Sequence, residues 1–448
     1  MKRQREDTDY SMFNAEQGEF VSAVLKDIHA VVQDEAPTTR AYFLDGCGGT
    51  GKTTVYNYLI DYCDNHRIVS ASSAWTGIAA TLLTRGQTCH SLFKLAIPVE
   101  KSSVDLTDKV LKKFLRSVIV FIVDEASMIP THALWVIDCL LRQATDVDIP
   151  FGGKVFILGG DFRQVLPVIR KGNRRVIVGN CLKNSVLWPE IRRYRLTRNM
   201  RARGDQEFAQ WLLGIGNGSN STIVLPPQIN VVKGDIIDEV FTNLETSHSS
   251  AIVTPKNETC HRINTEVICR LPGRAMEYLS IDSSVEGVAS DILNNLTPTG
   301  MPPHRLILKP GAIVMLTQNL CVSRGLCNGT RLIVRTLRKD ELDAEIVTGV
   351  CAGERIFIVR IDVYRRDDES SINMKRRQFP LRLAYCMTIN KSQGQTFDKV
   401  GIYLPNSVFT HGQLYVAFSR VRSFRDVYIQ ICGGSANTTR NIVFDEVL

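Results

Sequence analysis

The chain has 448 residues, which is enough for two or three domains. Hydrophobic residues make up 44% of it and charged residues 22%, an ordinary globular composition, and no apolar run is long enough to predict a membrane span. The first ten residues mix both charge signs and lack an apolar core, so no secretory signal is expected. The net charge of +8 permits a polyanionic partner without requiring one.

The cysteines and the basic clusters further narrow the class of protein. The twelve cysteines are scattered without CxxC pairs, which predicts reduced thiols in an intracellular protein and disfavours zinc. "KRQR" near the start suits either a nuclear address or a solvated disordered tail, residues 1–13, and the tail is favoured. Basic clusters at residues 192–203 and 375–377 are by themselves typical of solvated faces. The motifs described below make nucleic acid the better interpretation of both.

Short, bulky apolar runs recur along the chain with helix-like segments between them. In the first half they lie at residues 41–44, 67–72, 118–123 and 154–160, and in the second at 251–255, 400–404 and 427–431. Such runs are typical of strands buried on both faces, and their alternation with helices predicts parallel sheets. The sequence therefore predicts two α/β domains.

Two stretches depart from this pattern. "GIGNGSNST" at 214–222 is the most loop-like segment, rich in Gly, Ser and Asn. Residues from about 318 to 380 form short alternating strands separated by turn residues. This alternation predicts a small β-barrel inserted into the second α/β domain.

A phosphate-binding loop follows the first predicted strand. "GCGGTGKT" satisfies G-x-x-x-x-G-K-[ST] between a strand and a helix, the context that makes this motif credible. Its backbone N–H groups and the helix N-terminus bind phosphate oxygens. Lys52 is expected to reach the β- and γ-phosphates, and Thr53 to ligate Mg²⁺. The predicted nucleotide-binding residues here are Gly46, Gly48, Gly49, Thr50, Gly51, Lys52, Thr53 and Thr54.

Two acids end the apolar run "VIVFIV". Carboxylates at the carboxyl end of such a strand face the phosphate loop of the same sheet. Asp124 is therefore expected to hold Mg²⁺, and Glu125 to orient or deprotonate the attacking water. Together the two motifs predict an enzyme that hydrolyses a nucleoside triphosphate, but they do not yet predict a motor.

Three further residues favour a motor. Gln164 lies just past the next buried strand, where its amide can hydrogen-bond the γ-phosphate and report its loss. Arg201 and Arg420 are candidates for arginines that reach the triphosphate and stabilise the transferred phosphoryl group. Any of the three, taken alone, is more typical of a solvated surface. Together they make closure of an interdomain cleft depend on the γ-phosphate.

At this point the chain resembles the Pif-one family of superfamily 1 DNA helicases, and within it the branch of Helitron transposons and large DNA viruses. The resemblance runs from "FNAEQ" to "VFDEV". Its blocks, in order, are "GCGGTGKTT", "SSAWTGIAATLLTRGQTCHSLFKL", "VDEASM", "PFGGKVFILGGDFRQVLPV", "LTRNMRA", "GLCNGTRLIV", "RRQFPLRLAYCMTINKSQGQTFDKVGIYL" and "HGQLYVAFSRV". Two departures are "QVLPV" where the family often has Q-L-P-P-V, and Val359 where a barrel proline is common.

The resemblance implies a fold and an activity. It implies an α/β fold with RecA-like domain 1 at 14–200, RecA-like domain 2 at 201–317 and 381–448, and an inserted Src-homology-3-like barrel at 318–380. It also implies ATP- and Mg²⁺-dependent 5′ to 3′ movement on single-stranded DNA and unwinding at duplex junctions, in replication, recombination or repair. The protein is expected to be a monomer, located in the nucleus or in a host cell if a virus encodes it. The short flanks suggest a minimal helicase core, and partners among replication or recombination proteins are possible.

The resemblance also assigns residues by position. Gln17 matches a glutamine that reads adenine, Gln164 a sensor, and Arg201 and Arg420 arginine fingers. "TINKSQGQT" matches a block that links DNA contact to nucleotide contact, with Gly394 near the phosphates. The DNA-binding residues that it implies are Thr76, Thr88, His90, Thr388, Asn390 and Lys391.

Three other functions remain open. An RNA-stimulated helicase is one, because nothing in the sequence reads a 2′-hydroxyl. A nucleotide-gated DNA-binding scaffold is another, although Glu125, Gln164 and the two arginines argue for hydrolysis. A small-molecule kinase is the least favoured, because it needs neither these arginines nor "TINKSQGQT".

Overall fold

The computed structural model describes residues 12–102, 104–169, 172–198, 205–298, 300–349, 351–366, 372–433 and 437–448. Its contacts divide the chain into two compact units. Unit 1 comprises Met1–Arg203 with Phe444–Leu448, and unit 2 comprises Gly204–Val443. Within the described ranges, none of the helices combines the length and the apolar character needed to cross a membrane.

Unit 1 is built on a six-stranded, fully parallel sheet. The strand order is β3-β2-β4-β5-β1-β6. The central strands consist almost entirely of buried residues, as expected for a parallel sheet that is covered on both faces. The strands are β1 Arg40–Gly46, β2 Ser70–Ala74, β3 Gln87–Thr88, β4 Val120–Asp124, β5 Val155–Gly160 and β6 Arg192–Leu196.

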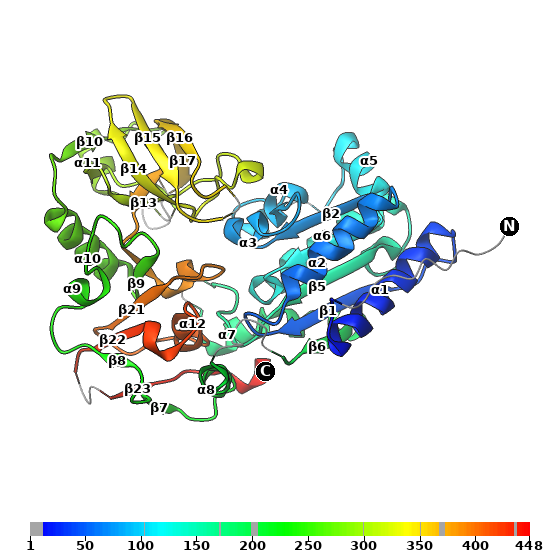
Figure 1. Ribbon diagram of the computed structural model, residues 1–448. Helices are drawn as coiled ribbons and strands as arrows, with labels where there is room; N and C mark the ends of the chain where they lie inside the picture. The colour runs from blue at the N-terminus through cyan, green and yellow to red at the C-terminus, as the bar shows by residue number, and fades with distance from the viewer. Residues whose placement is uncertain are drawn as a thin grey trace. The chain divides into compact units, whose positions relative to one another are not determined.

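Helices cover this sheet. Figure 1 shows α1 and α2 side by side along it. The helix α2 begins directly after the phosphate-binding loop, so its N-terminus points at the carboxyl end of β1. The helices of unit 1 are α1 Ala15–Val32, α2 Lys52–Asn65, α3 Gly77–Thr81, α4 Cys89–Leu92, α5 Lys109–Ser117, α6 Thr131–Thr145 and α7 Arg174–Gly179.

Unit 2 contains a second all-parallel sheet, in the order β20-β9-β21-β22-β8. Its strands are β8 Asn230–Val231, β9 Ser250–Thr254, β20 Cys386–Thr388, β21 Lys399–Leu404 and β22 Val427–Ile431. A separate pair joins β7 Thr222–Val224 to β23 Thr438–Arg440. The helices of unit 2 are α8 Gln206–Gly216, α9 Ile236–Val240, α10 Asn257–Arg270, α11 Ser290–Asn295 and α12 Gln413–Phe418. The two α/β domains predicted from the apolar runs are thus confirmed.

The β-rich insertion in unit 2 is larger than the range 318–380 predicted for it. Its five-stranded antiparallel sheet, β16-β15-β14-β13-β19, includes strands on both sides of that range. Two small sheets, β10-β12 and β11-β18-β17, belong to the same region. The strands are β10 Met276–Leu279, β11 Ile281–Ser284, β12 Arg305–Leu308, β13 Ile313–Leu316, β14 Arg331–Leu337, β15 Glu341–Ile346, β16 Arg355–Val359, β17 Ile361–Arg366, β18 Asn373–Gln378 and β19 Leu381–Leu383.

Two other predicted boundaries differ from the structure. The predicted loop 214–222 begins inside α8, because Leu212 and Ile215 continue a buried helical face. The last five residues, predicted in the second domain, belong to unit 1, where Arg174 pairs with Glu446 at 2.7 Å and stacks over the ring of Phe444. Residues 1–11 of the predicted tail lie outside the described residues.

Candidate functional site

The phosphate-binding loop joins β1 to α2 in a conformation that only its glycines adopt without strain. Gly49 and Gly51 have φ of 91° and 85°, in the left-handed region. The loop is closed by Thr50, whose N–H and Oγ1 donate to the Cys47 carbonyl at 3.3 and 2.9 Å. Successive N–H groups in such a turn form a concave anion site, and the N-terminus of α2 adds partial positive charge. The predicted loop therefore has the form that phosphates require.

Lys52, the first residue of α2, lies over this loop. Its ammonium group donates to the Gly46 carbonyl and is 3.5 Å from the carbonyl oxygen of Cys47. Both acceptors are neutral carbonyls of the loop itself. Phosphate oxygens carry more negative charge and would compete for the same donor, as expected for the lysine of a nucleotide-binding loop.

The two predicted catalytic acids lie at the carboxyl end of β4, where Asp124 is the last residue of the strand and Glu125 follows it. Asp124 is 7% exposed, and burial raises its pKa, an effect that the charge of Lys52 opposes. One Asp124 oxygen accepts the N–H of Glu125 at 2.9 Å. Glu125 itself has φ of 54°, which is strained for a residue with a side chain. Such strain is found preferentially at functional sites, and here it coincides with the acid expected to act on water.

Behind these acids lies Tyr56, which the sequence motifs did not reveal. Its hydroxyl group is fully buried and, within the described ranges, has no hydrogen-bond partner. Burial, and then the charges of Asp124 and Glu125, raise its pKa well above its ordinary value. A Cβ atom at Gly159 of β5 would lie 1.5 Å from this hydroxyl oxygen. The close contact between α2 and β5 therefore requires glycine at position 159.

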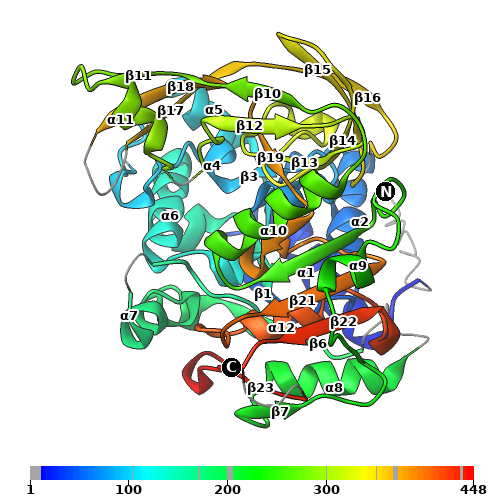
Figure 2. The same ribbon diagram turned by 90° about the vertical axis from the view of Figure 1, so that its left-hand side faces the viewer.

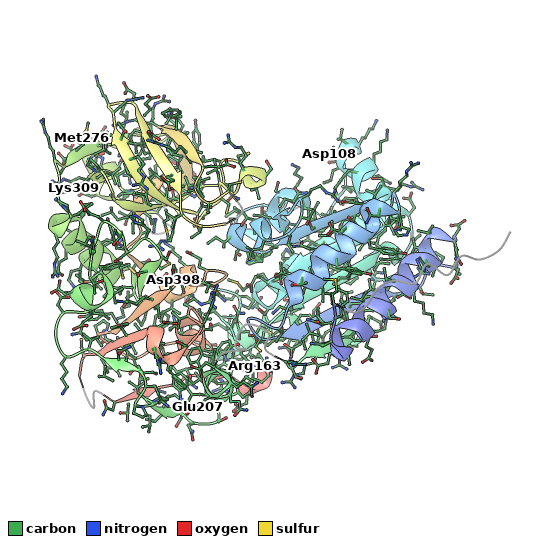
Figure 3. All side chains as sticks on the ribbon, viewed as in Figure 1. Asp108, Arg163, Glu207, Met276, Lys309 and Asp398 are labelled. Carbon is green, nitrogen blue, oxygen red and sulfur yellow. The ribbon has the colours of Figure 1, made fainter. Side chains whose placement is uncertain are left out.

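The predicted sensor Gln164 lies in a turn just past β5. The turn is closed by its backbone N–H, which donates to the Asp161 carbonyl at 3.0 Å, and the side chain is 6% exposed. Arg163, labelled in Figure 3, pairs with Asp161 at 2.9 Å and lies 3.8 Å from Asp45, directly before the phosphate-binding loop. Burial raises the pKa of Asp45, and the charge of Arg163 opposes this. The pair of Asp45 and Arg163 thus links the ends of β1 and β5.

Gln17, assigned by resemblance to adenine, contacts the phosphate-binding loop. It belongs to a capping box with Asn14 at the start of α1. Its Nε2 atom donates to the Thr50 carbonyl at 3.0 Å, and its Oε1 atom accepts the N–H of Asn14 at 3.1 Å. The side chain therefore ties α1 to the loop, and the reading of adenine stays a prediction.

The strand-contacting candidates of unit 1 occupy helix starts. Thr76 caps α3 and Thr88 caps α4, each accepting a backbone N–H with its hydroxyl oxygen. His90, whose pKa is lowered by burial, lies with its ring 4.7 Å from that of Trp75. The backbone N–H of Trp75 donates to the Asp124 carbonyl at 3.1 Å. Trp75 was not among the predicted DNA-binding residues, and the only sequence signal for such a role is that it is the one aromatic residue in "SSAWTG".

The motif "TINKSQGQT" of unit 2 folds as a strand end followed by a tight turn. Thr388 ends β20, and a 3₁₀-helix covers Ile389–Ser392. The Gln413 amide donates to the side chain of Asn390 at 3.2 Å. Gly394 has φ of 75°, so glycine is favoured there.

Arg420 braces this turn from within unit 2. Its guanidinium group donates to the carbonyls of Ser392 at 3.0 Å and Gln395 at 2.8 Å, which flank Gly394. A third bond goes to the Val416 carbonyl at 2.9 Å, and the residue is 6% exposed. The predicted arginine finger is thus held against the backbone of the predicted DNA-contacting motif. Arg201, the other predicted finger, lies outside the described residues.

The two basic clusters are only partly free for a polyanion. Arg192 pairs with Asp27, and Arg195 lies 3.5 Å from Asp45. In β18, Arg376 is fully buried against Asp282, while the cations at 375 and 377 share one acid, Asp362. Among the described residues of the two clusters, these five cations therefore have acidic neighbours within the protein.

Metal-ligating residues are sparse. In the described ranges, no group of three or more His, Cys, Asp or Glu residues is placed to hold a metal ion. Thr53, at the start of α2, and the buried Asp124 offer one hydroxyl and one carboxylate. Such a set suits Mg²⁺, which takes few protein ligands and completes its shell with phosphates and water.

Comparisons with known proteins agree with this geometry. A family model described as PIF1-like helicase matches residues 12–224, and one described as the 2B domain of DNA helicase Pif1 matches residues 291–337. The chain is 30% identical to the ATP-dependent DNA helicase Pif1 of Bdellovibrio bacteriovorus, covering 86% of this chain and 83% of that protein. It spans 59% of the length of the Xenopus laevis relative. An uncharacterized protein of Invertebrate iridescent virus 6 is 24% identical over 90% of this chain, which leaves the branch assignment a prediction.

Solved structures share the fold over nearly the whole chain. The Pif1 helicase of Candida albicans is 23% identical and superposes with a TM-score of 0.71, covering 97% of both chains. Bacteroides Pif1 bound to single-stranded DNA is 25% identical, with a TM-score of 0.69 over 94% of this chain and 92% of that one. The parallel sheets of the two units are therefore of the RecA-like type.

Proposed function

The chain belongs to the PIF1-like helicase family, and from that premise we propose that it is an ATP-dependent DNA helicase that moves 5′ to 3′ along single-stranded DNA. The observation that carries the proposal is the position of Arg420. Its bonds to Ser392 and Gln395 join a candidate phosphate-sensing group to the turn that follows Lys391, a candidate strand contact. A protein that only binds nucleotide has no use for such a link.

In this proposal unit 1 binds and hydrolyses ATP. The N–H groups of the phosphate-binding loop and the ammonium group of Lys52 hold the phosphates. Thr53 and Asp124 would hold Mg²⁺, which when bound supplies positive charge beside the β- and γ-phosphates. Glu125 orients the attacking water and accepts its proton. Gln164, fixed on its turn after β5, contacts the γ-phosphate.

In this proposal the DNA strand lies against one set of residues in each unit. In unit 1 these are Thr76, Thr88 and His90, with the Trp75 ring as a stacking surface for a base. In unit 2 they are Thr388, Asn390 and Lys391. The backbone of Trp75 is hydrogen-bonded to that of Asp124. In each unit, therefore, a residue proposed to contact DNA adjoins a residue proposed to contact the nucleotide.

Arginine fingers couple the two activities. In the proposed cycle Arg420, with Arg201, exchanges protein contacts for oxygens of the γ-phosphate. Exchange at Arg420 would release the carbonyls beside Gly394 and alter the grip at Lys391. Hydrolysis and departure of the cleaved phosphate would then reverse the change, because the anion that attracts the arginines leaves the site.

We further propose that the insertion, from Met276 to Leu383, is the Src-homology-3-like domain expected from the resemblance. Its five-stranded antiparallel sheet and its buried core, which includes Leu332, Val334 and Leu342, support this. We propose a monomer that works in the nucleus, or in a host cell if virus-encoded, in replication, recombination or repair. Contacts with proteins of these pathways are part of the proposal.

The deciding experiment is unwinding of duplexes with a 5′ tail or a 3′ tail, in the presence of ATP and magnesium. We expect strand displacement only with the 5′ tail. Displacement only with the 3′ tail would contradict the direction of movement. ATP hydrolysis without displacement of either duplex would favour a nucleotide-gated scaffold, and stronger stimulation by RNA than by DNA of the same sequence would favour an RNA-stimulated enzyme.

A further inference from the structure

Unit 2 contains a cavity of about 190 Å³ that none of the sequence motifs describes as a whole. One wall is the helix α10, which Figure 2 shows beside the strands β10 and β12 of the insertion. The other walls are β12, β13, β19 and the start of the motif after β20. Thr388 and Lys391, which are both predicted to contact DNA, line the cavity. The cavity therefore adjoins the proposed path of the single-stranded DNA.

Much of the lining is apolar. Leu306, Met315 and Met387 are each 2% exposed, and Ile268 on α10 is 4% exposed. Methionine side chains are polarizable and make favourable contacts with aromatic rings. Walls of this kind suit a flat, aromatic group and are poorly matched to a hydrated phosphate.

The polar part of the lining consists of cations and neutral groups. Arg382, Lys391, His261 and Arg305 line the cavity, and no aspartate or glutamate does. Arg305 is paired with Glu277. Arg382 has one side-chain hydrogen bond, to the Met301 carbonyl at 3.3 Å, and neither Arg382 nor Lys391 has an acidic partner in the described ranges. Burial lowers the pKa of Arg382, and burial with the nearby Arg382 charge lowers that of Lys391 to about 8. The positive charges of Arg382 and Lys391 repel one another, and an electron-rich ligand bound beside them would reduce this repulsion.

The cavity is also held in shape. The Asn264 side chain donates to the Cys386 carbonyl at 2.8 Å and accepts the Cys386 N–H at 2.9 Å. This paired contact fixes α10 against β20. A ligand therefore finds its walls already in place, so less ordering is needed on binding.

We propose that this cavity takes one nucleobase turned out of the single strand, with the acceptor edge of the base against Arg382 and Lys391 and its faces against the apolar walls. The inference rests on the proposed function and extends it. Arg and Lys are donors only, so they match carbonyl oxygens such as O4 of thymine or O6 of guanine. Adenine instead presents an amino donor on that edge and fits less well. The helicase therefore has a base preference, where backbone contacts alone would give none.

The test compares binding of three oligomers of equal length: oligo(dT), oligo(dA), and an oligo(dT) in which half of the bases are replaced by abasic sites. We expect the wild type to favour oligo(dT) over each of the others by roughly tenfold. Arg382→Met keeps an unbranched apolar side chain but removes the guanidinium donors, and Thr265→Phe places a bulky ring at a residue that lines the cavity. Both variants should reduce the preference to about twofold or less. Arg338→Met removes an exposed cation elsewhere in unit 2 and is the matched control.

Each outcome decides one point. If a variant weakens the binding of all three oligomers by the same factor, the substituted residue contacts phosphate, and the proposed base site is overturned. Equal wild-type affinity for all three also overturns it, even if ATP hydrolysis and unwinding are intact. If no oligomer binds and none stimulates hydrolysis, the proposed function itself fails. Thermal unfolding of each variant shows whether a loss of preference reflects the cavity or a loss of fold.

Discussion

The phosphate-binding loop of unit 1 and the base cavity of unit 2 solve the same problem, the binding of an electron-rich group, in different ways. In the loop nearly all contacts come from eight consecutive residues, and the ammonium group of Lys52 is hydrogen-bonded to carbonyls of that loop. In the cavity the lining comes from residues 257 to 391, and two of its cations, Arg382 and Lys391, have no acidic partner among the described residues. The loop is therefore formed by local backbone geometry, whereas the cavity depends on the packing of several elements.

The largest expected effect lies in the loop. Lys52→Ala removes the side-chain cation that the phosphate-binding loop itself supplies to the phosphates, so DNA-stimulated ATP hydrolysis should fall by roughly a thousandfold or more. Binding of single-stranded DNA without nucleotide should stay within about twofold, because the strand contacts are elsewhere. Hydrolysis and oligonucleotide binding, measured side by side, check this. Lys113→Ala, on the exposed side of α5, is the control, and wild-type hydrolysis by Lys52→Ala would overturn the site.

Arg420 tests whether the two sites are coupled. Arg420→Ala should reduce turnover on the order of a thousandfold while ATP still binds, because an arginine finger acts mainly in the transition state. Unlike Lys52→Ala, it should also weaken DNA binding, since it releases the carbonyls of Ser392 and Gln395. Turnover, binding of an ATP analogue and DNA affinity are measured together.

Two outcomes at this position are informative. Arg420→Lys keeps the charge but cannot bond all three carbonyls at once, so it should recover part of the turnover and little of the DNA affinity. The exposed neighbour substitution Arg422→Ala should change neither. Weak ATP binding with normal turnover of bound ATP would contradict the assignment of Arg420 as a finger.

The cavity depends on a buried ion pair in the insertion. Arg376 donates to Asp282 and to the carbonyl of Pro302 at 3.1 Å, beside Pro303 in the cavity wall. Asp282→Asn leaves Arg376 charged and buried, so we expect a loss of about 3–5 kcal/mol in the free energy of unfolding of unit 2. Asp362 of β17 makes more exposed pairs with the neighbouring cations of β18, and these should be worth less than about 1 kcal/mol in Asp362→Asn.

Urea denaturation of both variants measures this difference, and the oligomer comparison shows whether the cavity survives. Base preference should fall in Asp282→Asn and stay in Asp362→Asn. Equal loss of stability in the two variants would show that burial does not distinguish the pairs.

The loop was predictable and the cavity was not, for a physical reason. Gly49, Gly51 and Lys52 act through local backbone conformation, which a short pattern records. Arg382 and His261 carry no local signal, because their roles arise from long-range packing of β19 against α10. The extent of the insertion was missed for a similar reason, since β10 and β12 are four residues each and pair only with one another. Tyr56 carries no local signal either, because its close contact is with Gly159, which is far from it in the sequence.

That contact gives a smaller prediction. Gly159→Ala places a methyl group where the Tyr56 hydroxyl lies, and Tyr56 is fully buried and cannot swing out to solvent. We expect a loss of about 1–3 kcal/mol in the free energy of unfolding of unit 1, with reduced turnover as Asp124 and Glu125 shift. Gly179→Ala, where no atom lies within 4 Å, should cost almost nothing. Thermal unfolding compares the two, and equal effects would contradict the close contact.

The smallest effect concerns pH and sharpens the contrast between the two lysines. Burial and Arg382 lower the pKa of Lys391 to about 8 in the free protein, and an acceptor on a bound base would raise it again. Affinity for oligo(dT) should therefore be full below pH 8 and fall by up to tenfold per pH unit above it, until the pKa of the bound state is reached. Lys391→Gln should flatten this profile and bind more weakly at pH 7. Because the folded pKa lies below that of the unfolded chain, Lys391 disfavours folding at pH 7, so the same variant should be slightly more stable there. A profile that stays flat to pH 9 in the wild type would remove Lys391 from the base site.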